Sequence, residues 1–249
     1  MIRVRLTRVR GSSPREAGAE MVVGPDSTHG TIGGGHLEYM AIDRARAMLS
    51  RGESGATMDV ALGPEIGQCC GGRVELRLDR APPTPEPPRP PVLIFGAGHV
   101  GRALAAALLP LPVAPRLIDQ RPAELALAMP GVPTTLTPLP EVELRRAPGG
   151  AAFVIVTHDH ALDFLLATEA LARGDAAYVG MIGSRTKRTT FARFARQHGV
   201  SPDALVCPIG AGGARDKRPA VIAALTAAEL LTALLAPAGP APVPMTLAD

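Results

Sequence analysis

Aromatic side chains are scarce in this chain, which holds no tryptophan, two tyrosines and five phenylalanines among 249 residues. Proteins that bind single-stranded nucleic acid stack bases on aromatic rings, and this chain offers few such rings. Its net charge of +3 is small, and the basic residues are spread along the sequence rather than gathered in one arm. We therefore predict that nucleic acid is not a partner.

Cysteine and long apolar runs are also scarce. The cysteines are Cys69, Cys70 and Cys207, an odd number at spacings that make no disulfide framework. The N-terminal segment is interrupted by arginines, unlike the apolar core of an export signal. The longest apolar run, residues 220–236, contains Glu229 and falls short of the ~20 apolar residues of a membrane span. These absences predict a cytoplasmic protein with no membrane segment.

Prolines divide the chain in two. Residues 81–91 read APPTPEPPRPP, and such a run lacks backbone donors and favours extended over packed structure. We predict a small α+β domain over residues 1–80, a proline-rich linker over residues 81–91 and a second domain over residues 92–249. In the first domain the pattern predicts strands at residues 2–10, 58–62 and 74–78 and a helix at residues 36–51.

The second domain alternates between strand and helix patterns. Strands are predicted at residues 92–95, 116–119, 152–157, 177–180 and 205–208, and helices at residues 99–109, 162–173, 186–198 and 219–236. This alternation implies a parallel sheet that helices cover on both faces. The predicted fold class is therefore α/β, with a Rossmann-like doubly wound parallel sheet after the small α+β domain.

A glycine-rich turn follows the first strand of the second domain. Gly96, Gly98 and Gly101 have the spacing G-x-G-x-x-G, which lets a backbone turn approach a pyrophosphate at a helix N-terminus. Asp119 ends the next strand, where an acidic residue contacts a ribose hydroxyl, so the pattern predicts a dinucleotide such as NAD(P). The alternative is that the glycines only tighten the turn, since fold does not fix function.

Two further polar segments follow strands of the second domain. Thr157, His158, Asp159 and His160, with Asp163 close behind, could hold a metal or move protons; the alternative is a helix cap with loop histidines nearby. Ser184, Arg185 and Lys187 open the next helix and suit an anion such as a phosphate, and the alternative there is a solvated basic first turn.

The first domain has two candidate segments of its own. Gly33, Gly34, Gly35 and His36 lead into the predicted helix, and three glycines in a row could cradle an anionic head group or simply form a tight turn. Gln68, Cys69 and Cys70 lie in a glycine-bracketed turn, where accessible thiolates suit soft metals and sulfur transfer. The alternative for each cysteine is a small buried apolar side chain.

Six motifs occur together in the chain: GSSPREAGAEMVV, GTIGGGHLE, GQCCGGRVEL, IFGAGHVGRAL, VTHDHALD and YVGMIGSRTKR. In this order they resemble the xanthine dehydrogenase accessory protein family, which is related to the carbon monoxide dehydrogenase maturation factors. The likeness spans roughly residues 8–231. The segment 211–223 departs from the stretch found in many relatives and is closer to the branch linked to xanthine dehydrogenase.

The resemblance implies a protein that is not itself an enzyme. It would bind the molybdenum cofactor (molybdopterin), hold it while a partner cysteine desulfurase supplies the terminal sulfur, and insert it into apo xanthine dehydrogenase or a related molybdoenzyme. Carried onto this chain, the cofactor contacts would come from the residues named above in both domains, including His99 in the glycine-rich motif, with Cys69 and Cys70 near molybdenum or its sulfur.

Two other functions stay open at this point. One is an NAD(P)-dependent oxidoreductase that uses the glycine-rich turn and Asp119, with His158 or His160 as the proton donor. The other is an interaction scaffold with an empty nucleotide fold, which would bind no small ligand. A homodimer is an expectation that no motif supports.

Overall fold

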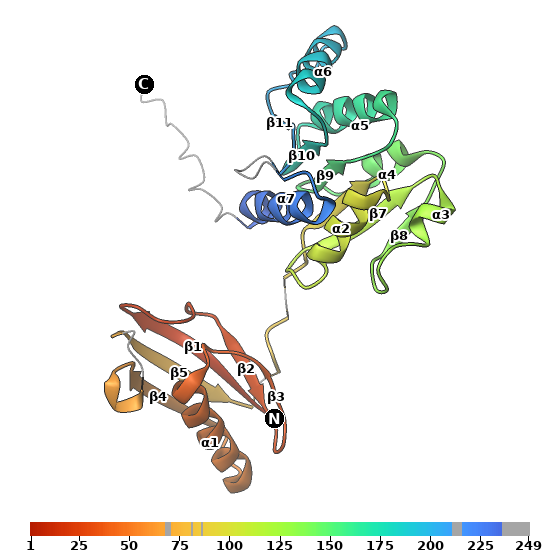
Figure 1. The fold of residues 1–249 in the computed structure, drawn as a ribbon. Helices are drawn as coiled ribbons and strands as arrows, with labels where there is room; N and C mark the ends of the chain where they lie inside the picture. The colour runs from red at the N-terminus through yellow and green to blue at the C-terminus, as the bar shows by residue number, and fades with distance from the viewer. Residues whose placement is uncertain (68–70, 81, 86, 211–215, 236–249) are drawn as a thin grey trace, which may run out of the picture. The chain divides into compact units, whose positions relative to one another are not determined.

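The computed structural model describes residues 1–67, 71–80, 82–85, 87–210 and 216–235. The chain forms two compact units, Met1–Pro87 and Pro88–Asp249 (Figure 1). The division between them falls inside the proline-rich stretch 81–91. Among the helices within the described ranges, none combines the length and apolar character needed to cross a membrane.

The first unit is an antiparallel sheet with one long helix. The sheet has the order β3-β2-β1-β5-β4, with strands β1 (Ile2–Arg10), β2 (Glu20–Val23), β3 (Thr28–Gly30), β4 (Gly55–Ala61) and β5 (Arg73–Asp79). Helix α1 (Gly35–Arg51) buries Leu37, Ala41, Ala45 and Met48 at helical spacing, and a short 3-10 turn, Pro64–Ile66, precedes β5. Strand β1 alternates buried and exposed residues, as expected for a strand with one face on the core.

The second unit is a six-stranded parallel sheet with the order β11-β10-β9-β6-β7-β8. Its strands are β6 (Pro91–Phe95), β7 (Ala114–Asp119), β8 (Thr134–Leu136), β9 (Ala152–Ile155), β10 (Tyr178–Met181) and β11 (Leu205–Val206). Its helices are α2 (His99–Leu108), α3 (Pro122–Leu125), α4 (Pro140–Arg146), α5 (His160–Arg173), α6 (Arg185–Gln197) and α7 (Pro219–Leu234). The predicted Rossmann-like doubly wound fold is confirmed.

Helices cover both faces of this sheet (Figure 1). Val92 and Ile94 of β6 face a core cluster that includes side chains of α2 and α7, such as Leu104 and Leu230. Phe95 points the other way, into a second cluster built with α5 and α6. Because both faces are buried, the central strands are continuous apolar runs. The strand order turns at β6, and ligands of open α/β sheets bind at the carboxyl ends of the strands near such a point.

Some short elements were not predicted from the sequence. The structure adds strands β2, β3 and β8 and helices α3 and α4, each of seven residues or fewer, and it begins β4 three residues before the predicted start at residue 58. The predicted strand at residues 205–208 is only the two-residue β11. Short segments carry too few turns or alternations for a clear periodic signal, so only the longer elements were visible.

Candidate functional site

The carboxyl ends of β6, β9 and β10 bring most of the predicted site residues of the second unit to one edge of the sheet. The glycine-rich turn follows β6, the segment beginning at Thr157 follows β9, and the segment containing Ser184 follows β10. These strands are neighbours in parallel register, with Phe95 beside Ile155 and Ile155 beside Met181. Segments that are far apart in the sequence therefore end side by side.

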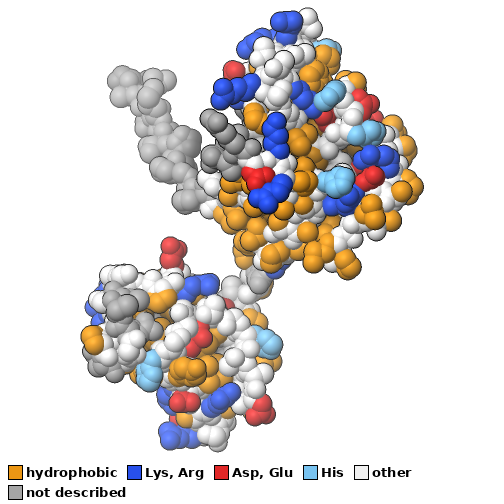
Figure 2. All heavy atoms as spheres, viewed as in Figure 1, with side chains coloured by type: hydrophobic (Ala, Val, Ile, Leu, Met, Phe, Trp, Pro, Cys, Tyr) orange, Lys and Arg blue, Asp and Glu red, His pale blue; other side chains and the backbone are white. Residues whose placement is uncertain are grey.

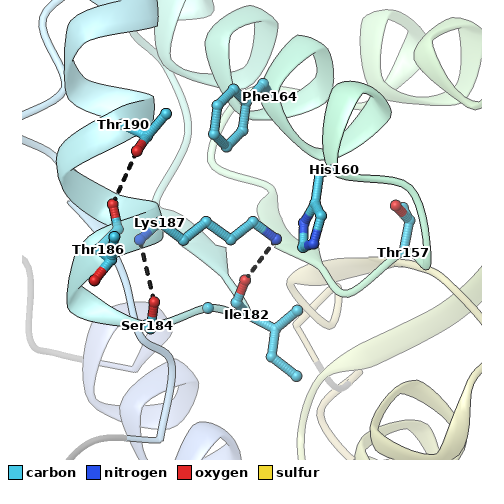
Figure 3. A pocket seen from close by; sticks show the side chains of 9 residues that line it. Thr157, His160, Phe164, Ile182, Ser184, Thr186, Lys187 and Thr190 are labelled. Atoms are coloured by element: carbon cyan, nitrogen blue, oxygen red, sulfur yellow. Dashed lines mark hydrogen bonds between the residues drawn. The ribbon is translucent and has the colours of Figure 1, made fainter.

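An open cleft of about 600 Å³ lies between α5 and α6 at this edge. Figure 3 shows the side chains that line it, which come from both helices and from the loops after β9 and β10: Thr157, His160, Phe164, Ile182, Gly183, Ser184, Thr186, Lys187 and Thr190. Lys187 extends from α6 across the cleft toward His160 (Figure 3). The cleft unites two predicted segments, 157–160 and 184–187, in one site.

A buried ion pair forms the floor of the cleft. Asp163 is fully buried, and it accepts hydrogen bonds from the backbone N–H of Thr157 at 3.1 Å, the Thr157 hydroxyl at 2.7 Å and the ammonium of Lys187. Lys187 also donates to the carbonyl of Ile182 at 3.0 Å. The prediction that Lys187 presents its charge to an anionic ligand needs correction, because Asp163 already balances that charge. The sequence placed Asp163 in this motif but did not predict that it pairs with Lys187.

Helix capping explains two of the predicted residues. The Asp159 side chain accepts from the backbone N–H groups of Ala161 and Leu162 at the start of α5. The Ser184 side chain accepts from the N–H of Lys187 at the start of α6. His158, His160 and Arg185 are exposed. In the described part of the chain no group of three or more His, Cys, Asp or Glu side chains is placed to hold a metal, so the capping interpretation of Asp159 fits and the metal interpretation of this segment has no support.

Packing accounts for two glycines of the glycine-rich turn. A Cβ at Gly96 would lie 2.4 Å from the carbonyl oxygen of Val156, and one at Gly101 would lie 1.8 Å from that of Gly96. A Cβ at Gly98 would meet no heavy atom of the described residues within 4 Å. Of the three glycines in this turn, Gly98 is therefore the one that packing within the described residues does not require. His99, the next residue, is exposed.

Asp119 lies where the spacing predicted, at the end of β7, but its carboxylate is already bonded within the protein. It accepts from the N–H of Ala97 in the glycine-rich turn at 2.6 Å and from the guanidinium of Arg121 at 2.8 and 2.9 Å. Burial alone would raise the pKa of Asp119, but these bonds and the backbone N–H of Arg121 outweigh it and lower the pKa to about 2. The expected ribose contact would have to compete with Arg121.

In the first unit, a carboxylate of the protein itself binds the triple-glycine turn. Glu38 of α1 reaches back and accepts from the N–H groups of Ile32 and Gly34, both at 2.9 Å, and from the Thr31 hydroxyl. The turn was predicted to cradle an anionic ligand. These two N–H groups and the Thr31 hydroxyl are instead bound by the carboxylate of Glu38. Gly33, Gly34 and Gly35 all have positive φ, which explains why three glycines stand in the turn.

Comparison with known families decides the relationship. The model described as the XdhC Rossmann domain matches residues 92–230, more than half of the chain, and the model of the XdhC and CoxI family matches residues 1–61. The chain belongs to the XdhC family. Both of its units therefore have counterparts in this family, and the predicted resemblance is confirmed.

Two individual proteins extend the comparison of this XdhC family member. An uncharacterized protein of Escherichia coli K12, YqeB, is 29% identical over an alignment of 223 residues that covers 81% of this chain and 38% of that protein. The chain thus spans well under half the length of this curated relative. A crystal structure described as a xanthine dehydrogenase from Bacillus halodurans superposes with a TM-score of 0.80 over 94% of this chain and 91% of that one, at 18% identity. At this identity the match establishes a shared fold.

The two XdhC family models cover some of the candidate residues and not others. The cleft, the glycine-rich turn and Asp119 all lie within the matched Rossmann domain, and residues 33–36 lie within the matched N-terminal region. In the first unit His36 is exposed in the first turn of α1. Gln68, Cys69 and Cys70 lie outside the described residues and outside both matched ranges, so their predicted role remains a prediction.

Proposed function

We propose that this chain is an accessory protein in the maturation of xanthine-dehydrogenase-type enzymes, which binds the molybdenum cofactor and delivers it to the apo-enzyme. The observation that carries the proposal is the pair of XdhC family matches, which occur in order on both units of the chain. In this role the cofactor is cargo, and the chain performs no turnover of its own. The apo-enzyme, a cysteine desulfurase and a second copy of this chain are the proposed partners.

The cleft between α5 and α6 fits such a cargo in size and in chemistry. Its volume of about 600 Å³ lies within the range of roughly 300–1,000 Å³ that is usual for small-ligand sites. Phe164 and Ile182 give it apolar walls for a ring system. The N-terminus of α6, with Ser184 and Arg185, supplies the positive end of a helix dipole for a phosphate group.

Cys69 and Cys70 are proposed as the contacts to molybdenum or to its sulfur ligand, because soft thiolates suit both. The proposal rests on their chemistry and on their glycine-bracketed sequence alone.

An NAD(P)-dependent oxidoreductase is the weaker candidate. It needs Asp119 to bind a ribose, and that carboxylate is bonded to Arg121 and to the glycine-rich turn. It also needs a proton donor in contact with substrate, and His158 and His160 are exposed side chains whose rings no hydrogen bond from another described residue orients.

The test is to incubate the purified protein with molybdenum cofactor under anaerobic conditions, remove free ligand by gel filtration and quantify bound molybdenum and pterin. We expect both to elute with the protein in stoichiometric amounts. Absence of both, together with tight binding of NADH in a parallel titration, would reject the accessory role and favour the oxidoreductase. The variants Cys69→Ala and Cys70→Ala should retain less molybdenum while their unfolding transitions stay unchanged.

A further inference from the structure

We infer that the Rossmann-like unit of this chain holds its ligand in the cleft between α5 and α6, and that its own side chains close the glycine-rich turn, where this fold commonly binds a nucleotide. The identity of the ligand rests on the proposed function. The location follows from the geometry of the two places, which lie at the same edge of the sheet but differ in room and in free hydrogen-bonding groups.

The place between Gly96 and Asp119, where a bound ribose would lie, has almost no room. The space lined by Gly96, Asp119, Gln120, Thr157 and His158, with the neighbouring apolar side chains, is about 10 Å³, against about 600 Å³ for the cleft. About 10–15 Å³ is the room that one water molecule requires. A ribose could therefore reach Asp119 through this space only by displacing protein side chains.

The polar groups at this turn are also satisfied within the protein. The carboxylate of Asp119 accepts a hydrogen bond from the N–H of Ala97, and Arg121 binds both oxygens of that carboxylate. Arg102 holds the other side of the turn by donating to the carbonyl of Ala97 at 2.6 Å and by pairing with Glu124. Opening the site means breaking charge-assisted hydrogen bonds around a carboxylate that is only 4% exposed.

The cleft offers what the turn lacks. The ammonium of Lys187 has three N–H donors, of which Asp163 and the carbonyl of Ile182 take one each. One N–H donor therefore remains. Lys187 lines the cleft, and so do the ring of Phe164 and the side chain of Ile182 (Figure 3). A fixed donor beside apolar walls suits a flat ring system that carries a carbonyl oxygen or a ring nitrogen as acceptor.

Three single substitutions separate the two places. Thr190→Phe adds a ring at an exposed position of α6 that lines the cleft. Thr189→Phe is its matched control. Thr189 immediately precedes Thr190 on α6 and is also exposed, but it does not line the cleft. Each of the two hydroxyls donates to the carbonyl four residues earlier. Gly98→Ala places a methyl group where a pyrophosphate would approach, and the φ of −67° and the open space at Gly98 accept it without strain.

Each variant is loaded with molybdenum cofactor as above, and the dissociation constant is measured from the retained pterin. We expect Thr190→Phe to weaken binding at least about tenfold, while Gly98→Ala and Thr189→Phe stay within about twofold of the wild type. Full binding by Thr190→Phe, or a loss confined to Gly98→Ala, would overturn the location in the cleft.

A titration with NADH tests the closed turn independently of the cofactor. We expect no binding up to millimolar NADH in the wild type. Tight binding that Gly98→Ala abolishes would overturn the closed turn. If the wild type retains no molybdenum cofactor at all, the proposed function fails and the assignment of that ligand to the cleft fails with it, whereas the NADH result still decides whether the turn is closed.

Discussion

Asp163 joins the loop after β9 to helix α6, because it binds both Thr157 and the Lys187 side chain that lines the cleft. Its carboxylate is fully buried, and the Lys187 side chain that it pairs with is 11% exposed. When one member of a buried ion pair is removed, the other is left as an uncompensated charge away from water. The pair therefore makes the site sensitive to single substitutions that keep the size of the side chain.

Asp163→Asn tests this dependence. We expect it to lower the free energy of unfolding by about 3–5 kcal/mol, measured by urea unfolding, because the ammonium of Lys187 loses its counter-charge. Asp159→Asn is the control on the same helix, since asparagine also caps helices well and the expected loss is below about 0.5 kcal/mol. A loss recovered in the double variant Asp163→Asn with Lys187→Met would identify the unpaired charge as the cause. Equal small losses in both single variants would refute the prediction.

Asp119 makes stability depend on pH in the acid range. Its pKa is about 2 in the folded protein against 3.8 for the ordinary carboxyl group, so the folded state favours the ionised form by about 2 kcal/mol. Because the folded pKa is the lower one, this contribution is complete above about pH 5 and is lost progressively as the pH falls through 2.

The variant Asp119→Asn should therefore be less stable than the wild type by about 2 kcal/mol at pH 7, and the difference should shrink as urea unfolding is repeated down to pH 2.5. Asp203→Asn makes the same atomic change at an exposed site bonded to Ser201, and we expect it to alter stability by less than about 0.5 kcal/mol at pH 7. A difference between Asp119→Asn and the wild type that stays constant over this range would contradict the folded pKa.

Sequence reasoning found the right places at the residue scale and missed several of the partners. The spacing from Gly96 correctly put Asp119 at the end of a strand, and the motif correctly put Ser184 at a helix start. It did not predict that Arg121 binds the carboxylate of Asp119 or that Lys187 pairs with Asp163 on another helix. The Lys187–Asp163 pair depends on how two helices pack, which no local periodicity records, and the Arg121–Asp119 pair depends on the side-chain conformation of one arginine.

The side chain of Glu38 stabilises the turn that precedes α1. Glu38 lies on the helix and accepts two backbone N–H groups of the preceding turn, which no intrahelical carbonyl could satisfy. Burial would raise the pKa of Glu38, but the bonds from the Thr31 hydroxyl and from the turn amides outweigh it and lower the pKa. The turn and the helix therefore hold each other in place.

Glu38→Ala should cost about 2 kcal/mol of unfolding free energy, because two N–H donors and a hydroxyl lose their acceptor. Asp43→Ala, at an exposed position of the same helix, removes a carboxylate with no such role and should have little effect. Chemical denaturation followed by circular dichroism measures both. If the two variants lose stability equally, Glu38 does not hold the turn.

At the scale of elements, length decided what could be predicted. The long helix α1 and the helices α5 and α6 show several apolar residues at helical spacing, and their predicted ranges agree with the observed ones within two residues. The strand β8 and the helix α3 have three and four residues, too few to show a period, and they were not predicted. The sequence predicted an anion site at Ser184, Arg185 and Lys187, but only the pairing of β9 with β10 shows that this segment lies beside Thr157 and His160.

The molecule as a whole has separate apolar cores. The buried cluster of the first unit contains residues of that unit only, and the two clusters of the second unit lie on the two faces of its sheet. The proline-rich stretch between them has the composition of a semi-rigid spacer. Figure 2 shows charged side chains on the surfaces of both units, as expected for bodies that each bury a core of their own.

We expect two unfolding transitions in differential scanning calorimetry, one for each unit. Leu6 is fully buried in the first unit, so Leu6→Ala should destabilise that unit by roughly 2–5 kcal/mol and shift one transition only. Leu166→Ala, in the second unit and equally buried, should shift the other. A single transition that both variants move together would show that the units unfold as one.

The ion pair under the cleft also sets how ligand binding should respond to ionic strength. Since Asp163 neutralises Lys187 at the floor, a ligand there meets a fixed dipole and not a net positive charge. Dissolved salt screens exposed charges over about 8–10 Å but acts weakly on a paired and buried one. The contact that a ligand makes with Lys187 should thus change little between low and physiological salt, whereas salt should weaken the attraction of the exposed Arg185 for a phosphate group.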